Sequence, residues 1–173
     1  MVGLCFSVEG LGFYVICFCN CNIKMFIKQK NGFFVYSYDD LAGVVSKNIM
    51  PKLDKYKIIA LKGPLGVGKT SLVKEVLKQS GIGDVVNSPT FAYVKTYKKN
   101  KNLFFDHFDL YRIDSLEMFV SLGLNEYFYD ENRLTIIEWP EVIETILDKK
   151  KVLNIILSYH LLNNDCRVMK CAY

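Results

Sequence analysis

Arginine is scarce in this sequence of 173 residues, whose basic residues are nearly all lysine. The only arginines are Arg112, Arg133 and Arg167, and they are far apart in the chain. The formal net charge is +4. A charge this small does not indicate a dedicated nucleic-acid-binding protein, although it permits a weak electrostatic contact.

The sequence also lacks cysteines at the spacing of a metal site. Its six cysteines lie near the ends of the chain: Cys5, Cys17, Cys19, Cys21, Cys166 and Cys171. No C-x-x-C pair occurs, so the spacing typical of zinc ligands is absent. Cys17, Cys19 and Cys21 would point to one side of a strand, which suits neither tetrahedral zinc nor mutual disulfides. We interpret the cysteines as free thiols of a reducing compartment and expect a cytoplasmic protein.

A long hydrophobic run is missing as well. The apolar segment 11–19 is too short to span a bilayer. A secretory signal would open with positive charge, yet the first basic residue is Lys24 and an acid, Glu9, precedes it. We therefore predict no membrane association. Residues 1–24 are interpreted as a dispensable extension, with an added edge strand as the alternative, and residues 25–173 as a single domain.

What the sequence does contain is the pattern G-x-x-x-x-G-K-[ST], at residues 63–70. An apolar run at 58–61 precedes it and predicts a buried strand, and residues 71–78 follow with apolar positions at helical spacing. This strand–loop–helix order is the context of a P-loop. Glycines let backbone N–H groups wrap closely round phosphate oxygens at the positive end of the helix. The pattern therefore predicts a P-loop that binds ATP or GTP.

Two side chains complete the expected phosphate site. Lys69 would reach the β- and γ-phosphates, and the Thr70 hydroxyl would ligate Mg²⁺. The residues of this segment expected to contact the nucleotide are Gly63, Leu65, Gly66, Val67, Gly68, Lys69, Thr70 and Ser71.

A P-loop also needs a carboxylate near Mg²⁺, usually at the carboxyl end of a neighbouring strand. Glu138 directly follows the predicted strand 134–137, and the stretch 103–109 supplies Asp106 and Asp109. Strand alternation places Asp109 on the same face as His107 and opposite Asp106. His107 is a candidate general base, although a structural role is commoner for a histidine at a strand end.

The remaining elements indicate an α/β fold. Further strands are predicted at 33–36, 91–97, 103–108, 152–159 and 166–171, and helices at 37–50, at 115–121 and from Pro140 onward. A lysine-rich turn at 98–102 would join two of the strands as a hairpin. We therefore predict a P-loop NTPase-like three-layer sandwich with a mixed central sheet.

Several ordered segments together resemble the TsaE family, the small ATPases of bacterial tRNA threonylcarbamoyladenosine (t6A) biosynthesis. The matching segments are residues 65–70, 88–91, 107–112, 122–127 and 137–141. A P-loop alone has little specificity, whereas the ordered series with H-x-D-L-Y-R and E-W-P is very specific. The resemblance covers roughly residues 33–170.

The resemblance implies an ATPase that uses ATP and Mg²⁺ and supports repeated turnover of the proteins TsaD and TsaB, with tRNA reached through that complex. Thr70 and Glu138 would serve the metal, and Asp109 would support hydrolysis together with Glu138 and Lys69. Thr90 would belong to a switch loop, and Trp139 would lie by the nucleotide. The lysines of the 98–102 turn would either be solvated or face tRNA.

Two other functions share these binding residues. One is a small-molecule or nucleotide kinase, which the scattered arginines and the lack of a lid-sized insertion disfavour. The other is a nucleotide-gated binding module with negligible hydrolysis, which only a turnover assay distinguishes.

If residues 1–24 are dispensable, a chain that begins at Met25 should fold and bind ATP as the full chain does. The expectation follows because segment 1–24 carries neither a motif nor the charge pattern of a targeting signal. Thermal melting and calorimetric titration with ATP, run on both chains, would test it. Insolubility of the shorter chain would instead favour an edge strand.

Overall fold

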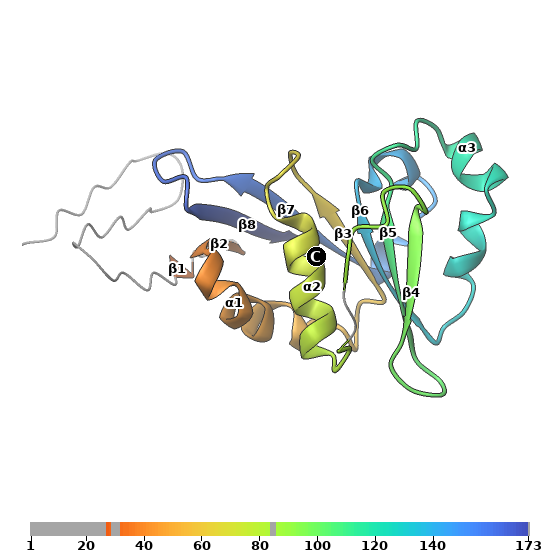
Figure 1. The fold of residues 1–173 in the computed structure, drawn as a ribbon, viewed down its shortest axis with the longest axis horizontal. Coiled ribbons are helices and arrows are strands. Elements are labelled where there is room, and N and C mark those ends of the chain that lie inside the picture. The colour runs from red at the N-terminus through yellow and green to blue at the C-terminus, as the bar shows by residue number, and fades with distance from the viewer. Residues whose placement is uncertain (1–26, 29–31, 84–85, 173) are drawn as a thin grey trace, which may run out of the picture.

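The computed structural model describes residues 27–28, 32–83 and 86–172. Within these residues, eight strands form one mixed sheet in the order β1-β2-β8-β7-β3-β6-β5-β4 (Figure 1). The strands are β1 (Ile27–Lys28), β2 (Phe33–Ser37), β3 (Ile58–Lys62), β4 (Val94–Lys98), β5 (Phe104–Asp109), β6 (Arg133–Glu138), β7 (Val152–Tyr159) and β8 (Cys166–Ala172).

Helices flank this sheet. The α-helices are α1 (Leu41–Asn48), α2 (Lys69–Gln79) and α3 (Leu116–Ser121). Short 3-10 helices are η1 (Tyr38–Asp40), η2 (Met50–Lys52), η3 (Leu124–Phe128), η4 (Pro140–Ile143) and η5 (Lys149–Lys151). Among the described residues, none of these helices is long and apolar enough to cross a membrane.

The four central strands, β7, β3, β6 and β5, run parallel to one another. Parallel strands are covered on both faces, and β3 accordingly reads as a continuous apolar run whose first four residues are all buried. Antiparallel strands complete both sides: β4 pairs with β5, while β8, β2 and β1 extend the sheet beyond β7. The predicted mixed sheet is confirmed.

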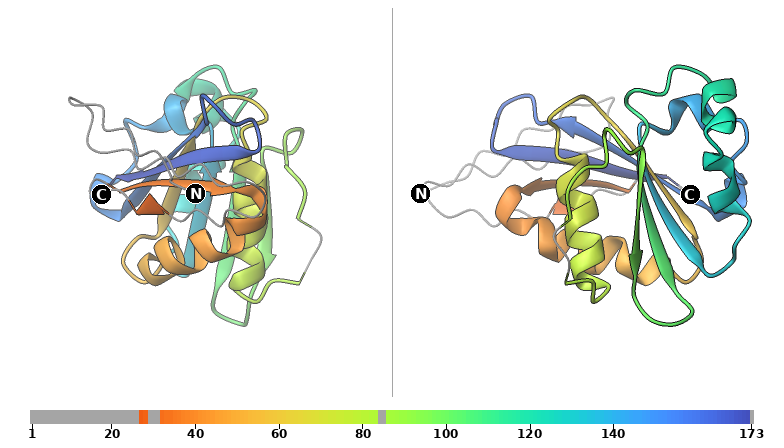
Figure 2. Two further views of the ribbon diagram at one scale, coloured as in Figure 1. Left: turned by 90° about the vertical axis from the view of Figure 1, so that its left-hand side faces the viewer. Right: turned by 45° about the vertical axis from the view of Figure 1, so that its right-hand side comes forward.

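A hydrophobic core lies on each face of the sheet. On one face, the apolar sides of α1 and α2 pack in one core with the sheet, through residues such as Val44, Leu72 and Ile59. On the other, Phe119 of α3 packs with Phe108 of β5 and with residues of η3 and η4. Figures 1 and 2 show these helical layers on opposite sides of the sheet. The three-layer α/β sandwich is thus confirmed.

The strand register brings the ends of three strands together. Glu138, the last residue of β6, pairs with Asp109 of β5 on one side and with Leu61 of β3 on the other. Because β3 leads directly into the 63–68 loop and α2, both acids lie at the edge of the sheet where the P-loop lies.

Two elements near the N-terminal and central parts of the chain differ from prediction. The helix predicted at 37–50 is α-helical only over α1, with 3-10 turns before and after it. Ser37 donates its hydroxyl hydrogen to the carboxylate of Asp40 (2.7 Å) and makes no side-chain cap bond. The strand predicted at 91–97 begins only at Val94, because the N–H groups of Ala92 and Tyr93 both donate to the carbonyl of Pro89 and form a turn.

The helix predicted from Pro140 is the short 3-10 helix η4 rather than an α-helix. Of the six cysteines, the structure describes Cys166 and Cys171, and both are free thiols. The other four cysteines, together with the predicted extension 1–24, lie outside the described residues.

The aromatic cluster around Phe108 supplies a test of the packing. Phe108 is fully buried, and its ring centroid lies 5.4 Å from that of Tyr127 and 5.7 Å from that of Phe128. Phe108→Ala should lower the free energy of unfolding by about 3–5 kcal/mol, since it removes a buried ring and leaves a cavity. Val120→Ala, at a half-exposed position of α3, should cost less than about 1 kcal/mol. Denaturant unfolding that ranks the two variants equally would contradict this description of the core.

Candidate functional site

The P-loop turns sharply between β3 and α2, and glycine is required where it turns. Gly63 has φ 139°, and a Cβ atom there would lie only 2.3 Å from the carbonyl oxygen of Leu157. Gly68 has φ 108° and immediately precedes the first residue of α2. These left-handed conformations are open to glycine at little cost, so the pattern in the sequence reflects the shape of the loop.

Lys69 lies across this loop and is almost fully buried. Its Nζ donates to the carbonyl oxygens of Gly63 (2.7 Å) and Pro64 (2.9 Å), and it lies 3.6 Å from the centre of the Trp139 ring. Burial lowers the pKa of the Lys69 ammonium, and the nearby carboxylate of Glu138 opposes that change most strongly. The loop therefore encloses a positive group that is held by oxygens and an aromatic face.

Glu138 is a buried carboxylate held from two elements. The hydroxyl of Thr70 donates to both of its oxygens, at 2.8 and 3.1 Å. Nε2 of the fully buried His107 lies 2.9 Å from Oε1 of Glu138. The predicted pair of Thr70 and Glu138 is thus brought together, and their oxygen atoms are of the kind that Mg²⁺ prefers.

His107 does not line the cavity that the P-loop faces. It lies on the same face of the sheet as Asp109, as the alternation predicts, but its contact is with Glu138. The structure therefore gives His107 a positioning role toward Glu138.

Asp109 is fixed by the segment that leads to β4. The hydroxyls of Ser88 and Thr90 both donate to Oδ2 of Asp109, the latter at 2.7 Å, and the N–H of Tyr111 donates to Oδ1 at 3.2 Å. The two hydroxyls also lie 2.7 Å apart. Residues 88–90, which include the Thr90 predicted for a switch loop, are therefore attached to the carboxylate at the end of β5.

Asp106, the other acid of this strand, lies outside the cavity. Its side chain is fully buried on the opposite face of β5, where it accepts from Nη1 of Arg133 at 2.8 and 2.9 Å and from the hydroxyl of Thr96 at 2.5 Å. These partners satisfy its oxygens, and Asp106 does not line the cavity that the P-loop faces.

Trp139 has a backbone conformation rare for its residue type. Its φ of 61° and ψ of 57° are left-handed, which costs a non-glycine residue about 1–2 kcal/mol. The ring is half-buried against the apolar cluster below α3, and its centroid lies 5.0 Å from that of Tyr111. The strained turn places one face of the ring over Lys69. Trp139 thus both packs in the core and borders the site.

These side chains line one cavity of about 370 Å³ at the carboxyl edge of the parallel strands. The lining residues are Leu65, Gly66, Gly68, Lys69, Thr70, Ser71, Ser88, Thr90, Asp109, Tyr111, Arg112, Glu138 and Trp139. Of the predicted contacts, Gly63 lies behind Lys69 and Val67 is buried in the core, so neither lines the cavity.

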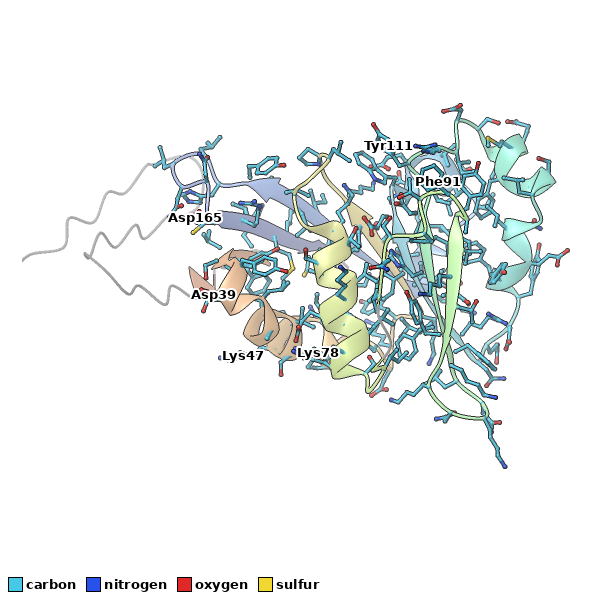
Figure 3. All side chains as sticks on the ribbon, in the orientation of Figure 1. Asp39, Lys47, Lys78, Phe91, Tyr111 and Asp165 are labelled. Carbon is cyan, nitrogen blue, oxygen red and sulfur yellow. The ribbon has the colours of Figure 1, made fainter. Side chains whose placement is uncertain are left out.

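Three lining residues were outside the predicted set of contacts: Ser88, Tyr111 and Arg112. The guanidinium of Arg112 lies 4.5 Å from the ring centre of the exposed Phe91. In the view of Figure 3, Phe91 and Tyr111 lie toward the same end of the sheet. Ser88, Tyr111 and Arg112 stand in segments that match the family, but the strand and turn patterns alone do not place their side chains in the cavity.

The C-terminal hairpin supports the P-loop from the other side. The hydroxyl of Tyr159 in β7 donates to the carbonyl of Leu65 (2.7 Å), and Nε of Arg167 in β8 donates to the carbonyl of Val67 (3.2 Å). The Arg167 guanidinium also lies 4.9 Å from the Tyr159 ring centre. Each contact joins residues some ninety or more positions apart, so no local pattern could predict it.

Removing the hydroxyl of Tyr159 should loosen the P-loop selectively. Tyr159→Phe keeps the ring beneath Arg167 but loses the bond to Leu65, worth about 1 kcal/mol. We expect the backbone amides of Gly66 and Val67 to exchange hydrogen about fivefold faster, as measured by NMR. Tyr38→Phe, at an exposed residue, is the matched control and should leave this exchange unchanged. Equal exchange in both variants would show that the bond does not restrain the loop.

Comparisons with known proteins identify the family of this chain. The family model described as "Threonylcarbamoyl adenosine biosynthesis protein TsaE" matches residues 40–166. The chain is 36% identical over 110 residues to the tRNA threonylcarbamoyladenosine biosynthesis protein TsaE of Borreliella burgdorferi, covering 64% of this chain and 79% of that one. It is 39% identical over 103 residues to the protein of the same name from Rickettsia bellii, covering 59% and 69%.

The fold has a solved counterpart. The crystal structure of Bacillus subtilis YdiB superposes with a TM-score of 0.58 and 24% sequence identity, over 80% of this chain and 84% of that chain. This likeness supports the α/β fold. With the family model spanning the P-loop, the 88–90 segment and both acidic strand ends, the chain belongs to the TsaE family.

Proposed function

We propose that this protein is the ATP-binding and ATP-hydrolysing subunit that supports repeated turnover of TsaD and TsaB in forming t6A at position 37 of tRNAs that read ANN codons. One observation carries the proposal: Lys69, Thr70, Asp109 and Glu138 converge on a single cavity at the mouth of a P-loop. The names of the similar proteins, which refer to tRNA threonylcarbamoyladenosine biosynthesis, support the pathway.

In this proposal the P-loop and Lys69 bind the triphosphate. The amino end of α2 offers N–H groups at the positive end of its dipole. Lys69 would exchange its bonds to the carbonyls of Gly63 and Pro64 for bonds to phosphate oxygens, which are stronger because both partners are charged. Trp139 would keep the ammonium in place from the other side.

Thr70 and Glu138 would hold Mg²⁺, and their hydroxyl and carboxylate oxygens suit that ion. When bound, Mg²⁺ neutralises charge on the β- and γ-phosphates. His107 would keep the Glu138 carboxylate oriented toward the cavity.

Asp109 would support hydrolysis and link it to the 88–90 segment. Its carboxylate lies at the cavity and accepts hydrogen bonds from Ser88 and Thr90. A movement of Asp109 during hydrolysis would therefore move the 88–90 segment. Arg112 is the only arginine that lines the cavity described here. Because so little cationic charge is available to stabilise the transition state, the protein by itself should hydrolyse ATP slowly. A cationic group supplied by a partner can raise such rates about 10³-fold or more.

The same link between Asp109 and the 88–90 hydroxyls favours a second candidate, a nucleotide-gated binding module that barely hydrolyses ATP. Phosphate release measured with and without partners separates the two candidates.

Three substitutions should separate the proposed roles. Lys69→Ala should weaken ATP binding by about 2 kcal/mol or more, because it removes charge-assisted bonds to phosphate.

Glu138→Ala should weaken the Mg²⁺-dependent part of ATP binding. Asp109→Asn should bind ATP but lose stimulated hydrolysis and t6A formation over many cycles. Calorimetry and a reconstituted assay with TsaD, TsaB, tRNA and the threonylcarbamoyl donor provide the measurements.

Asp114→Asn, at an exposed acid outside the cavity, is the matched control and should resemble the parent protein. The proposal fails if the parent protein hydrolyses ATP no faster with its partners and leaves the yield of t6A unchanged.

A further inference from the structure

A second and larger cavity lies at the opposite edge of the sheet from the P-loop. Its volume is about 490 Å³, and it opens at the amino ends of β3 and β6 beside the end of η3. The lining includes the cations Lys57, Arg133 and Lys151 and the aromatic rings of Tyr127 and Tyr129. Nothing in the proposed ATPase site uses these residues.

Two of the lysines are neighbours because of the strand register. Ile58 pairs with Val152, so the preceding residues, Lys57 and Lys151, lie side by side, and both are exposed. Lys151 also ends η5, whose three residues are all lysines. The edge therefore gathers cations from two separate segments of the chain.

The β4–β5 hairpin extends this charge. Its turn lies at the same end of the sheet, since Phe104 at the start of β5 pairs with Arg133 at the start of β6 (Figure 1). Nζ of Lys98 lies 5.9 Å from the Phe104 ring centre, and the Arg133 guanidinium lies 5.3 Å from the rings of both Phe104 and Tyr127. Cations and aromatic rings thus alternate from the hairpin to the cavity.

The lysines of this edge outnumber its acids, so the edge carries a net positive charge. Asp130 lines the cavity but accepts from Arg133 and from a backbone N–H. Asp148 caps η5. Glu131 also lines the cavity and offsets one charge. Against these acids stand the exposed lysines of the edge: Lys57, Lys98, Lys99, Lys101, Lys149, Lys150 and Lys151.

We propose that this edge binds RNA directly, with its lysines on phosphates and Tyr129 as a platform on which an unpaired base stacks. Tyr129 is 78% exposed, and an exposed ring among cations is what a single-stranded segment requires. An acidic protein surface is the competing occupant of this edge, and the experiments below separate it from RNA. This inference deepens the proposed function by giving the chain its own contact with RNA, at the edge away from the nucleotide.

Fluorescence anisotropy with the full chain at low salt tests the inference, using a labelled single-stranded RNA and an unmodified tRNA transcript as separate probes. The double variant Lys57→Glu/Lys151→Glu should bind RNA about tenfold more weakly or worse. Its plot of log affinity against log salt should also be less steep by about 1–2, since fewer phosphates are neutralised. Lys47→Glu/Lys74→Glu on α1 and α2 makes the same change in net charge and should weaken binding about twofold or less.

A second pair of variants tests stacking. Tyr129→Ala should weaken RNA binding about fivefold or more, and Tyr129→Phe should restore it because the ring remains. Calorimetric ATP binding should be unchanged in every variant of this edge, so failure of the ATPase proposal and failure of this one are distinguishable.

The proposal is overturned if the parent protein binds neither RNA, or if reversal of Lys57 and Lys151 leaves RNA affinity unchanged. Loss of co-purification with the protein partners while RNA binding stays intact would assign the edge to an acidic protein instead.

Discussion

The rest of the site depends on the burial of the Glu138 carboxylate at the end of β6. A buried charge costs several kcal/mol unless hydrogen-bonding partners compensate it. Here the compensation comes from Thr70 at the start of α2 and from His107 in β5. The same contacts therefore attach α2 to the sheet and join α2, β5 and β6 at this edge. Glu138 thus both lines the cavity and connects the elements that form it.

A second carboxylate, that of Asp109, lies beside Glu138 and adds like-charge repulsion. Asp109 lies directly across the strand pair from Glu138, and like charges at neighbouring strand ends repel. Burial lowers the pKa of Lys69, and both acids oppose that change in part because they favour its charged form. The hydroxyls of residues 88–90 supply the remaining compensation through Asp109. In the proposed function, a change in charge at the P-loop would act on that segment through Asp109.

The parallel strands also place the two cavities at opposite edges of the sheet. β6 begins with Arg133 at the lysine-rich edge and ends with Glu138 at the P-loop, so one strand connects both surfaces. Because all four central strands run in the same direction, loops that follow them gather at one edge and loops that precede them at the other. The proposed nucleotide site and the proposed RNA-binding edge therefore share no lining residues.

The sequence by itself determined the P-loop, the succession of strands and helices, and the two acids at strand ends, because periodicity and turn chemistry are local properties. The strand pattern alone could not decide between Asp106 and Asp109, although the family resemblance pointed to Asp109. In the structure, Asp106 accepts hydrogen bonds from Thr96 and Arg133 on the opposite face of β5. The sequence also could not show that the strand predicted from 91 begins at Val94, or that Tyr159 and Arg167 support the P-loop. The late start of β4 has a local cause, the turn in which Ala92 and Tyr93 donate to the carbonyl of Pro89. The place of Asp106 and the support of the P-loop were decided by the tertiary structure, since both depend on hydrogen bonds between residues distant in the chain.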